Sequence, residues 1–219
     1  HSVETAKYIL TKPGAPRDSH TPVKVSAYAN CLKWQLPKYS QQLADMSNGE
    51  LDYANKPSED FARALVEYRA EDGQTVVVEC STSWSFVGAG LRLSLELLGP
   101  EYSLSINSLD TDLKIFLSRE VQGKEGEDLV EKQNAEIGLM PVVSHEASAY
   151  GYEDENRHMV QAFLAGKRPD ETFEDGLRVT ELLMAAYMSA EKGSTIELAD
   201  ADLDTFIPAV ARGEWNPKQ

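Results

Sequence analysis

The sequence predicts an α+β protein in which a large, open and predominantly antiparallel sheet of about six or more strands is covered on one face by helices from both chain ends. Two observations support this fold class. Between residues 62 and 120, apolar and polar residues alternate with a period of two, and short turns separate successive runs, as in antiparallel strands. At both ends of the chain, apolar residues instead recur at three- and four-residue spacing, which is typical of amphipathic helices.

The first part of the chain alternates helix, loop and strand. Apolar residues at helical spacing predict a helix over 2–11, and prolines predict a loop after it. Alternation over 22–30 predicts a half-buried strand, and a short helix is expected over 38–46.

The central block is predicted to contain two hairpins and one further strand. The strands are expected over 62–70, 75–86, 91–99, 103–108 and 112–120. Residues 119–150 have weaker patterning and a charge-rich first half, so they are interpreted as an insertion or an exposed excursion.

The last third is predicted to be helical and to end in one strand. Acidic residues in the first turn predict the start of a helix over 151–166. A second helix, over 171–193, starts at a capping box of Thr172 and Asp175 and ends at Gly193. Its apolar stripe is expected to comprise Val179, Leu182, Leu183, Ala186, Tyr187 and Ala190. A strand is expected over 194–198. Residues 1–219 are interpreted as a single α+β domain.

Composition excludes several classes of partner. A net charge of −15 repels nucleic acid and anionic lipid, and no apolar run approaches the roughly 20 residues that a membrane-spanning helix needs. Cys31 and Cys80 are far apart in a chain too large to depend on disulfides. Two free, mostly buried thiols are therefore favoured over one disulfide, and a cytoplasmic location is expected.

Motifs for cofactor and metal binding are weak. Residues 88–93, GAGLRL, begin like a dinucleotide-binding fingerprint but lack its third glycine, and a strand follows where a helix is required. A turn explains them better, so no cofactor is expected to bind this chain alone. Glu155 and His158 have helical spacing for a shared metal, but no other segment supplies a matching pair, and no metal site is predicted.

Aromatic residues are the remaining candidates for ligand contact. Trp34, Trp84 and Tyr28 lie on or beside predicted strands, where their rings could stack on a sugar. Packing in the core or in an interface is the alternative, because aromatic side chains bury a large area. We take Trp34 and Trp84 as candidate substrate-binding residues.

Two segments resemble the Gfo/Idh/MocA oxidoreductases, the family of glucose-fructose oxidoreductase and inositol dehydrogenase. Residues 155–198 are similar to the closing segment of the family, with its FLAGKRP turn, EDGLRV helix start and SAEKG exit. HSVETAKYIL, at residues 1–10, resembles the family helix whose histidine points into the active site, and His1 matches that histidine. A cloning remnant is the alternative origin of His1.

The resemblance implies a hydride transfer between NAD or NADP and a carbinol carbon of a sugar or polyol. In the family, a Rossmann domain with a Glu-Lys-Pro motif comes before the segment at which this sequence starts. TKP at 11–13 and NKP at 55–57 do not match that motif. The chain is therefore expected to be the substrate-side, C-terminal part of a longer enzyme, with the cofactor bound by the other part and His1 assisting proton transfer.

A non-catalytic, dimerising or ligand-holding sheet module is the alternative function. Under both interpretations we expect a homodimer or tetramer that forms through the open sheet face, because no predicted helix remains to cover it. The residues expected on that face are Trp84, Phe86, Leu91, Leu93, Leu95 and Ile106.

Overall fold

The computed structural model describes residues 1–11, 18–85, 92–108, 110, 114–117, 138–141 and 145–216. The chain divides into two compact units. The first combines residues 1–85 with residues 171–219, and the second comprises residues 86–170.

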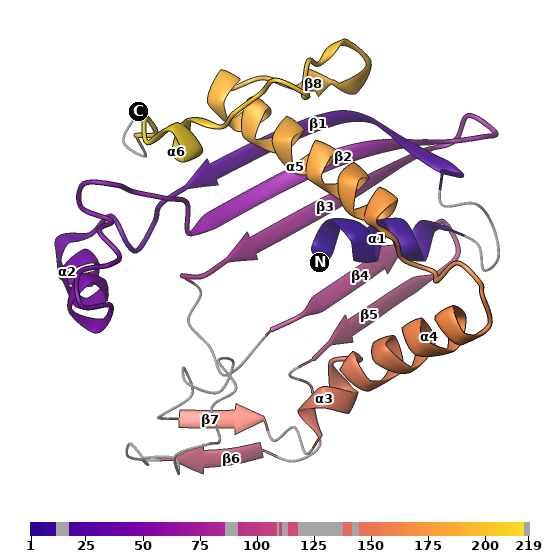
Figure 1. Ribbon diagram of the computed structural model, residues 1–219, viewed down its shortest axis with the longest axis horizontal. Helices are drawn as coiled ribbons and strands as arrows, with labels where there is room; N and C mark the ends of the chain where they lie inside the picture. Colours follow the sequence, from indigo (N-terminus) through magenta and orange to yellow (C-terminus); the bar gives the residue numbers. More distant parts are fainter. Residues whose placement is uncertain are drawn as a thin grey trace. The chain divides into compact units, whose positions relative to one another are not determined.

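The first unit is built on a four-stranded antiparallel sheet with the strand order β3-β2-β1-β8 (Figure 1). Its strands are β1 (His20–Asn30), β2 (Phe61–Ala70), β3 (Thr75–Ser83) and β8 (Ile196–Glu197). Its helices are α1 (Ser2–Leu10), α2 (Pro37–Met46), α5 (Phe173–Lys192), η1 (Leu198–Asp200) and α6 (Ala209–Arg212).

The alternation of residues along the strands separates an apolar from a polar face. Val25, Val66 and Val78 are partners across β1, β2 and β3, and Val25 and Val66 are almost fully buried. Neighbouring residues point to the opposite face. The tight turn between β2 and β3 contains Gly73 at φ +85°, a conformation that glycine adopts without strain.

Helix α5 covers the apolar face and completes the core (Figure 1). It begins at the predicted capping box, where the Asp175 carboxylate accepts hydrogen bonds from the Thr172 N–H (3.0 Å) and hydroxyl (2.8 Å). It ends at Gly193 in the left-handed conformation. Leu182 and Met188 pack against the buried strand residues, and α1 adds Val3 to the same cluster. Helices from both chain ends thus cover one face of the sheet, as predicted.

The predicted apolar stripe of α5 is only partly correct. The buried residues are Asp175, Leu182, Ala185, Met188 and Ser189, whereas Leu183 is 44 % exposed. Apolar residues cover a wide arc of this helix, so the sequence does not show which line within the arc faces the sheet. The close approach to β1 selects the line through Ala185 and Ser189.

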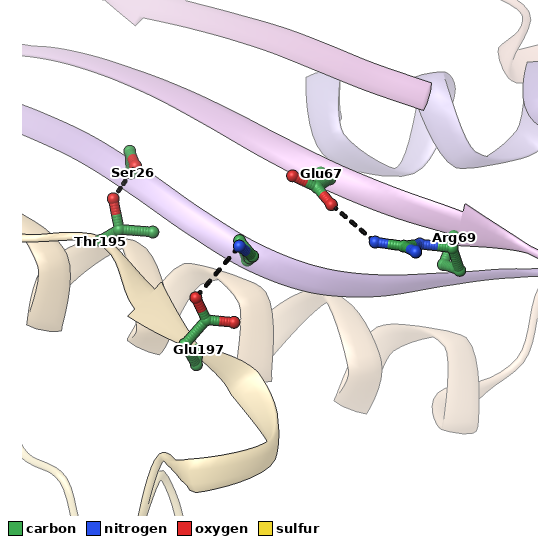
Figure 2. A network of polar contacts seen from close by, with 6 residues as sticks. Ser26, Glu67, Arg69, Thr195 and Glu197 are labelled. Atoms are coloured by element: carbon green, nitrogen blue, oxygen red, sulfur yellow. Dashed lines mark hydrogen bonds and ion pairs between the residues drawn. The ribbon is translucent and has the colours of Figure 1, made fainter. Parts of the chain in front are cut away.

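The opposite face of this sheet carries polar pairs among exposed apolar side chains. Figure 2 shows the hydrogen bond between the hydroxyls of Ser26 and Thr195 (2.7 Å) and the pair of Glu67 with Arg69 (3.0 Å). Lys24 pairs with Glu197 at 3.3 Å. Arg63 and Glu79 form another ion pair on this face. The exposed apolar side chains among these pairs are Tyr28, Leu65 and Val77.

The second unit contains two separate antiparallel pairs and two helices. The elements are β4 (Ser94–Leu98), β5 (Ser103–Asn107), β6 (Lys114–Leu117), β7 (Gly138–Pro141), α3 (Glu146–Ala149) and α4 (Tyr152–Leu164). The β4–β5 hairpin and helix α4 were predicted. The pairing of β6 with β7 was not, since β7 lies in the weakly patterned stretch 119–150, much of which is outside the described residues.

Three further predictions concern the two cysteines, the size of the sheet and membrane-spanning helices. Cys31 and Cys80 are free and buried, which confirms that prediction. The structure shows one four-stranded sheet and two-stranded pairs, so a single sheet of six or more strands is not shown. None of the helices in the described part of the chain has the length and apolarity needed to cross a membrane.

Two adjacent leucines test the line of contact between α5 and the sheet. We expect Leu182→Ala to lower the free energy of unfolding by about 2–5 kcal/mol, because Leu182 is 5 % exposed and its removal leaves a cavity. Leu183→Ala is the matched control and should change it by only about 0.5 kcal/mol. Urea denaturation followed by circular dichroism measures both values, and equal losses would contradict this assignment.

Candidate functional site

Asp60 joins three strands at one end of the four-stranded sheet. It immediately precedes β2, and its N–H donates to the carbonyl of Asn30 at the end of β1 (3.0 Å). Its own carbonyl accepts from the N–H of Trp84, directly after β3 (2.9 Å), and from the Ser83 hydroxyl (2.8 Å). The backbone of Asp60 therefore fixes where all three strands end.

The Asp60 carboxylate is buried and accepts hydrogen bonds from three consecutive backbone N–H groups. Leu32 donates to Oδ1 at 2.7 Å, and Lys33 and Trp34 donate to Oδ2 at 2.8 and 2.9 Å. Successive N–H groups of this kind form a concave binding site for an anion. Asp60 is 2 % exposed, so this arrangement supplies the partners that a buried carboxylate requires.

Cys31 lies against the same carboxylate and is chemically quiet. Its thiol donates to Asp60 Oδ2 at 3.7 Å. Burial and, next, the negative charge of Asp60 raise the pKa of Cys31 to about 11. Because the thiolate is the reactive form, Cys31 is a poor candidate for a nucleophile.

Trp34 lies in the loop between β1 and α2, within a cluster of aromatic and cationic side chains. Its ring makes an edge contact with Tyr39 at 6.5 Å and a tilted contact with Tyr53 at 6.5 Å. The Lys33 amine lies 4.5 Å from the centre of the same ring. Packing, the alternative raised by the sequence, therefore accounts for at least part of the Trp34 environment.

Carboxylate and phenol groups lie next to this cluster. The Tyr187 hydroxyl of α5 donates to the carboxylate of Glu59, and burial followed by this hydrogen bond raises the pKa of Tyr187. Burial also raises the pKa of Tyr53, with smaller contributions from the charges of Glu59 and Asp60. These groups could exchange hydrogen bonds with the hydroxyls of a polyol.

Trp84 differs from Trp34 because its side chain is 83 % exposed. It follows β3, and only its backbone N–H is held by Asp60. An exposed indole can present its ring to a ligand without rearrangement of its neighbours.

His1 precedes α1 and lies close to β3. Its carbonyl accepts from the N–H of Thr5 (2.8 Å), which begins the helix. Helix α1 contacts β3, so the start of α1 lies near that strand.

The structure thus brings the backbones of Trp34 and Trp84 to one residue, while His1 is placed separately. Among the described residues, no hydrogen bond, ion pair or ring contact joins His1 to either tryptophan. Asp60 could not be recognised from the sequence, because its partners are backbone groups that have no residue signature. Its position directly before an alternating strand was the one available signal.

Metal and dinucleotide sites were tested against the same described residues. No group of three or more His, Cys, Asp or Glu side chains could hold a metal ion in this part of the chain. His158 Nε2 instead accepts from the N–H of Asp170 at 3.0 Å. All described strand pairs are antiparallel, so these residues do not form a Rossmann-type site, in which the pyrophosphate binds where a parallel strand turns into a helix.

Comparisons with known proteins show the fold. Neither a protein-family model nor a curated protein matches the chain. Among solved structures, it is similar to GenD2 from gentamicin A biosynthesis, solved in complex with NAD, with 24% identity, a TM-score of 0.59 and 90% of this chain covered. A probable dehydrogenase from Thermotoga maritima matches 84% of this chain with 15% identity and a TM-score of 0.50. The chain spans 45% of the length of each of these two structures.

Asp60→Asn tests whether the carboxylate organises this end of the sheet. The amide nitrogen would face N–H donors that now bind a carboxylate, and we expect the free energy of unfolding to fall by about 1–3 kcal/mol. Asp45→Asn is the matched control, because Asp45 accepts one exposed hydrogen bond, from Gln41. Urea denaturation measures both variants.

A second readout isolates the charge of Asp60. Its removal should lower the pKa of Cys31, so alkylation of this thiol should rise at a lower pH in Asp60→Asn than in the parent protein. Rates measured from pH 7 to pH 11 by mass spectrometry report this shift. An unchanged pH profile together with unchanged stability would contradict the role assigned to Asp60.

Proposed function

We propose that this chain is the substrate-binding and oligomerisation part of an NAD-dependent or NADP-dependent oxidoreductase that acts on a carbinol carbon of a sugar or polyol. The observation that carries the proposal is the fold shared with GenD2, a protein solved with NAD, of whose length this chain spans 45%. The resemblance of residues 1–10 and 155–198 to Gfo/Idh/MocA oxidoreductases supports the same function. The cofactor is proposed to bind a part of the enzyme beyond these residues.

His1 is the proposed acid–base residue. Removal of a hydride from a carbinol carbon requires the hydroxyl proton to leave as well, so a base must lie within hydrogen-bond reach of that oxygen. Imidazole can accept and return such a proton near neutral pH. In the family pattern a lysine of the other domain takes the proton, and His1 would assist it.

Trp84 and Trp34 are the proposed sugar-contacting residues. The exposed ring of Trp84 can stack on the apolar face of a sugar. A sugar on the Trp34 ring would have to displace Lys33, whose amine lies 4.5 Å from the ring centre. Trp84 is therefore the stronger candidate of the two.

Replacement of His1 in the longer protein tests the catalytic proposal. We expect His1→Asn to lower turnover of a polyol about 10²- to 10⁴-fold, the usual contribution of acid–base catalysis, and to leave the dissociation constant of NAD or NADP unchanged. Steady-state kinetics and calorimetric titration measure the two quantities. His145→Asn, at another exposed histidine, is the control.

Two results would contradict this function. Unaltered turnover in His1→Asn would remove His1 from the mechanism. Absence of dinucleotide binding and of polyol oxidation in the longer protein would favour the non-catalytic sheet module instead.

We further propose that the chain forms a homodimer or tetramer through its outer sheet face. Leu65 and Val77 support this proposal, since they are 45 % and 64 % exposed on the face opposite α5. Of the residues predicted for the interface, Trp84, Leu93 and Ile106 are exposed, Leu95 is half-buried, and Phe86 and Leu91 lie outside the described residues.

Sedimentation equilibrium tests the assembly. We expect a mass of at least twice 24.2 kDa for the parent chain and a shift toward the monomer in Val77→Glu, because a charge would be buried in the interface. Met46→Glu, on exposed α2, is the control. A parent chain that stays monomeric at tens of micromolar would contradict the proposal.

A further inference from the structure

A second candidate site lies at the opposite end of β1 from Asp60. A cavity of about 500 Å³ opens beside the start of this strand, within the first unit. Its walls come from α1, the start of β1, the first half of α5 and the segment that follows β8. Because β1 has 11 residues, about 30 Å of strand separates this cavity from the Asp60 end.

Lys7 is the buried polar group in the wall of this cavity. Its side chain is 4 % exposed, and its amine has no hydrogen-bond partner among the described residues. Glu4 lies one helical turn earlier, but no ion pair within 4 Å joins it to Lys7 in the described part of the chain. Burial of an amine without a partner is unfavourable, so this position calls for an acceptor.

Glu4 is the acidic residue nearest to Lys7 in sequence, and the acidic residues that line the cavity come from other segments. Residues 12–17, KPGAPR, contain no Asp or Glu. The acidic residues that line the cavity are all exposed, namely Asp18, Glu181, Asp202 and Asp204. They form a rim, whereas Lys7 lies in the buried wall.

The rest of the lining combines the polar side chains of His20, Thr21 and the exposed Arg178 with an apolar part. Leu182 is buried, and Leu198, Ala201 and Leu203 are partly buried against the core cluster. A cavity of a few hundred cubic ångströms that offers both apolar surface and placed polar groups is typical of small-molecule sites. The ligand should therefore combine one polar group with an apolar body.

We propose that this cavity binds a small monocarboxylate with an apolar body, whose carboxylate pairs with the Lys7 amine. The buried amine provides a charge-assisted hydrogen bond to a carboxylate oxygen. The four rim carboxylates disfavour ligands with several negative charges, such as nucleotides and polyphosphates. This ligand is distinct from the polyol proposed for the Asp60 end.

Three probes with the same aliphatic chain test how the charge of a ligand, independently of its size, affects binding. Hexanoate, hexylamine and hexanol share an aliphatic chain but are anionic, cationic and neutral near pH 7. We expect hexanoate to bind with a dissociation constant of about 1 mM or lower. The amine and the alcohol should bind at least about tenfold more weakly. Titration of the ¹⁵N-labelled chain measures affinity and should shift the amide signals of Thr21, Val179 and Leu203.

Two variants and one control identify the site. Lys7→Met keeps an unbranched side chain that is one atom shorter and should weaken hexanoate binding at least about tenfold, because the charge-assisted bond is lost. Ala201→Leu should weaken binding of all three probes by filling the cavity, and it keeps the proposal testable if Lys7→Met does not fold. Lys24→Met removes an exposed amine that pairs with Glu197 and should leave binding unchanged.

The outcomes are decisive in both directions. Saturable hexanoate binding that weakens in Lys7→Met or Ala201→Leu and not in Lys24→Met supports the site. Absence of saturable binding, equal affinity for the three probes, or amide shifts confined to other residues would overturn it.

Discussion

The close packing of α5 on β1 is the contact on which the first unit depends. Ala185 is fully buried at this contact, and its small side chain lets helix and sheet approach closely. Ser189 completes the contact, because its hydroxyl accepts from the N–H of Ala27 (2.9 Å) and donates to the carbonyl of Ser194 (2.7 Å). One side chain thereby joins β1 to the segment that leads into β8. The buried residues of β1 and β2 pack against this helix, and α1 and the segment after β8 add partly buried residues to the same core.

Asp60 acts in a comparable way at the end of the sheet. Its carboxylate accepts hydrogen bonds from the backbone N–H groups of residues 32–34, in the loop that carries Trp34. Its carbonyl accepts a hydrogen bond from the N–H of Trp84, directly after β3. A loop held by charged hydrogen bonds can present aromatic side chains in a fixed position, which suits a binding site. Burial and the same charge raise the pKa of Cys31, which disfavours its reactive thiolate form.

Local pattern predicted the secondary-structure elements but gave no indication of the burial of Asp60 and Lys7. The capping box of Thr172 and Asp175 is a contact over three residues, and the alternation in β2 and β3 reports burial directly, so both could be recognised from sequence. Asp60 and Lys7 gave no such signal. Asp60 binds backbone groups 26 to 28 residues away, and Lys7 occupies an ordinary place in an amphipathic helix. Their importance comes from burial, which depends on elements distant in the chain.

By itself, the sequence determined the α+β class, the antiparallel hairpins, the helices at both ends and the two free cysteines, because each depends on spacing, composition or turn residues within a short window. Only the tertiary structure decided which line of α5 meets the sheet, since Leu182 and Leu183 are equally apolar and differ only in what lies opposite them. It also decided that Asp60 joins the two tryptophan-bearing segments and that the Lys7 amine is buried in a cavity wall. Hydrogen bonds between distant backbone groups and the exclusion of water arise only once the elements have packed, so no local pattern encodes them.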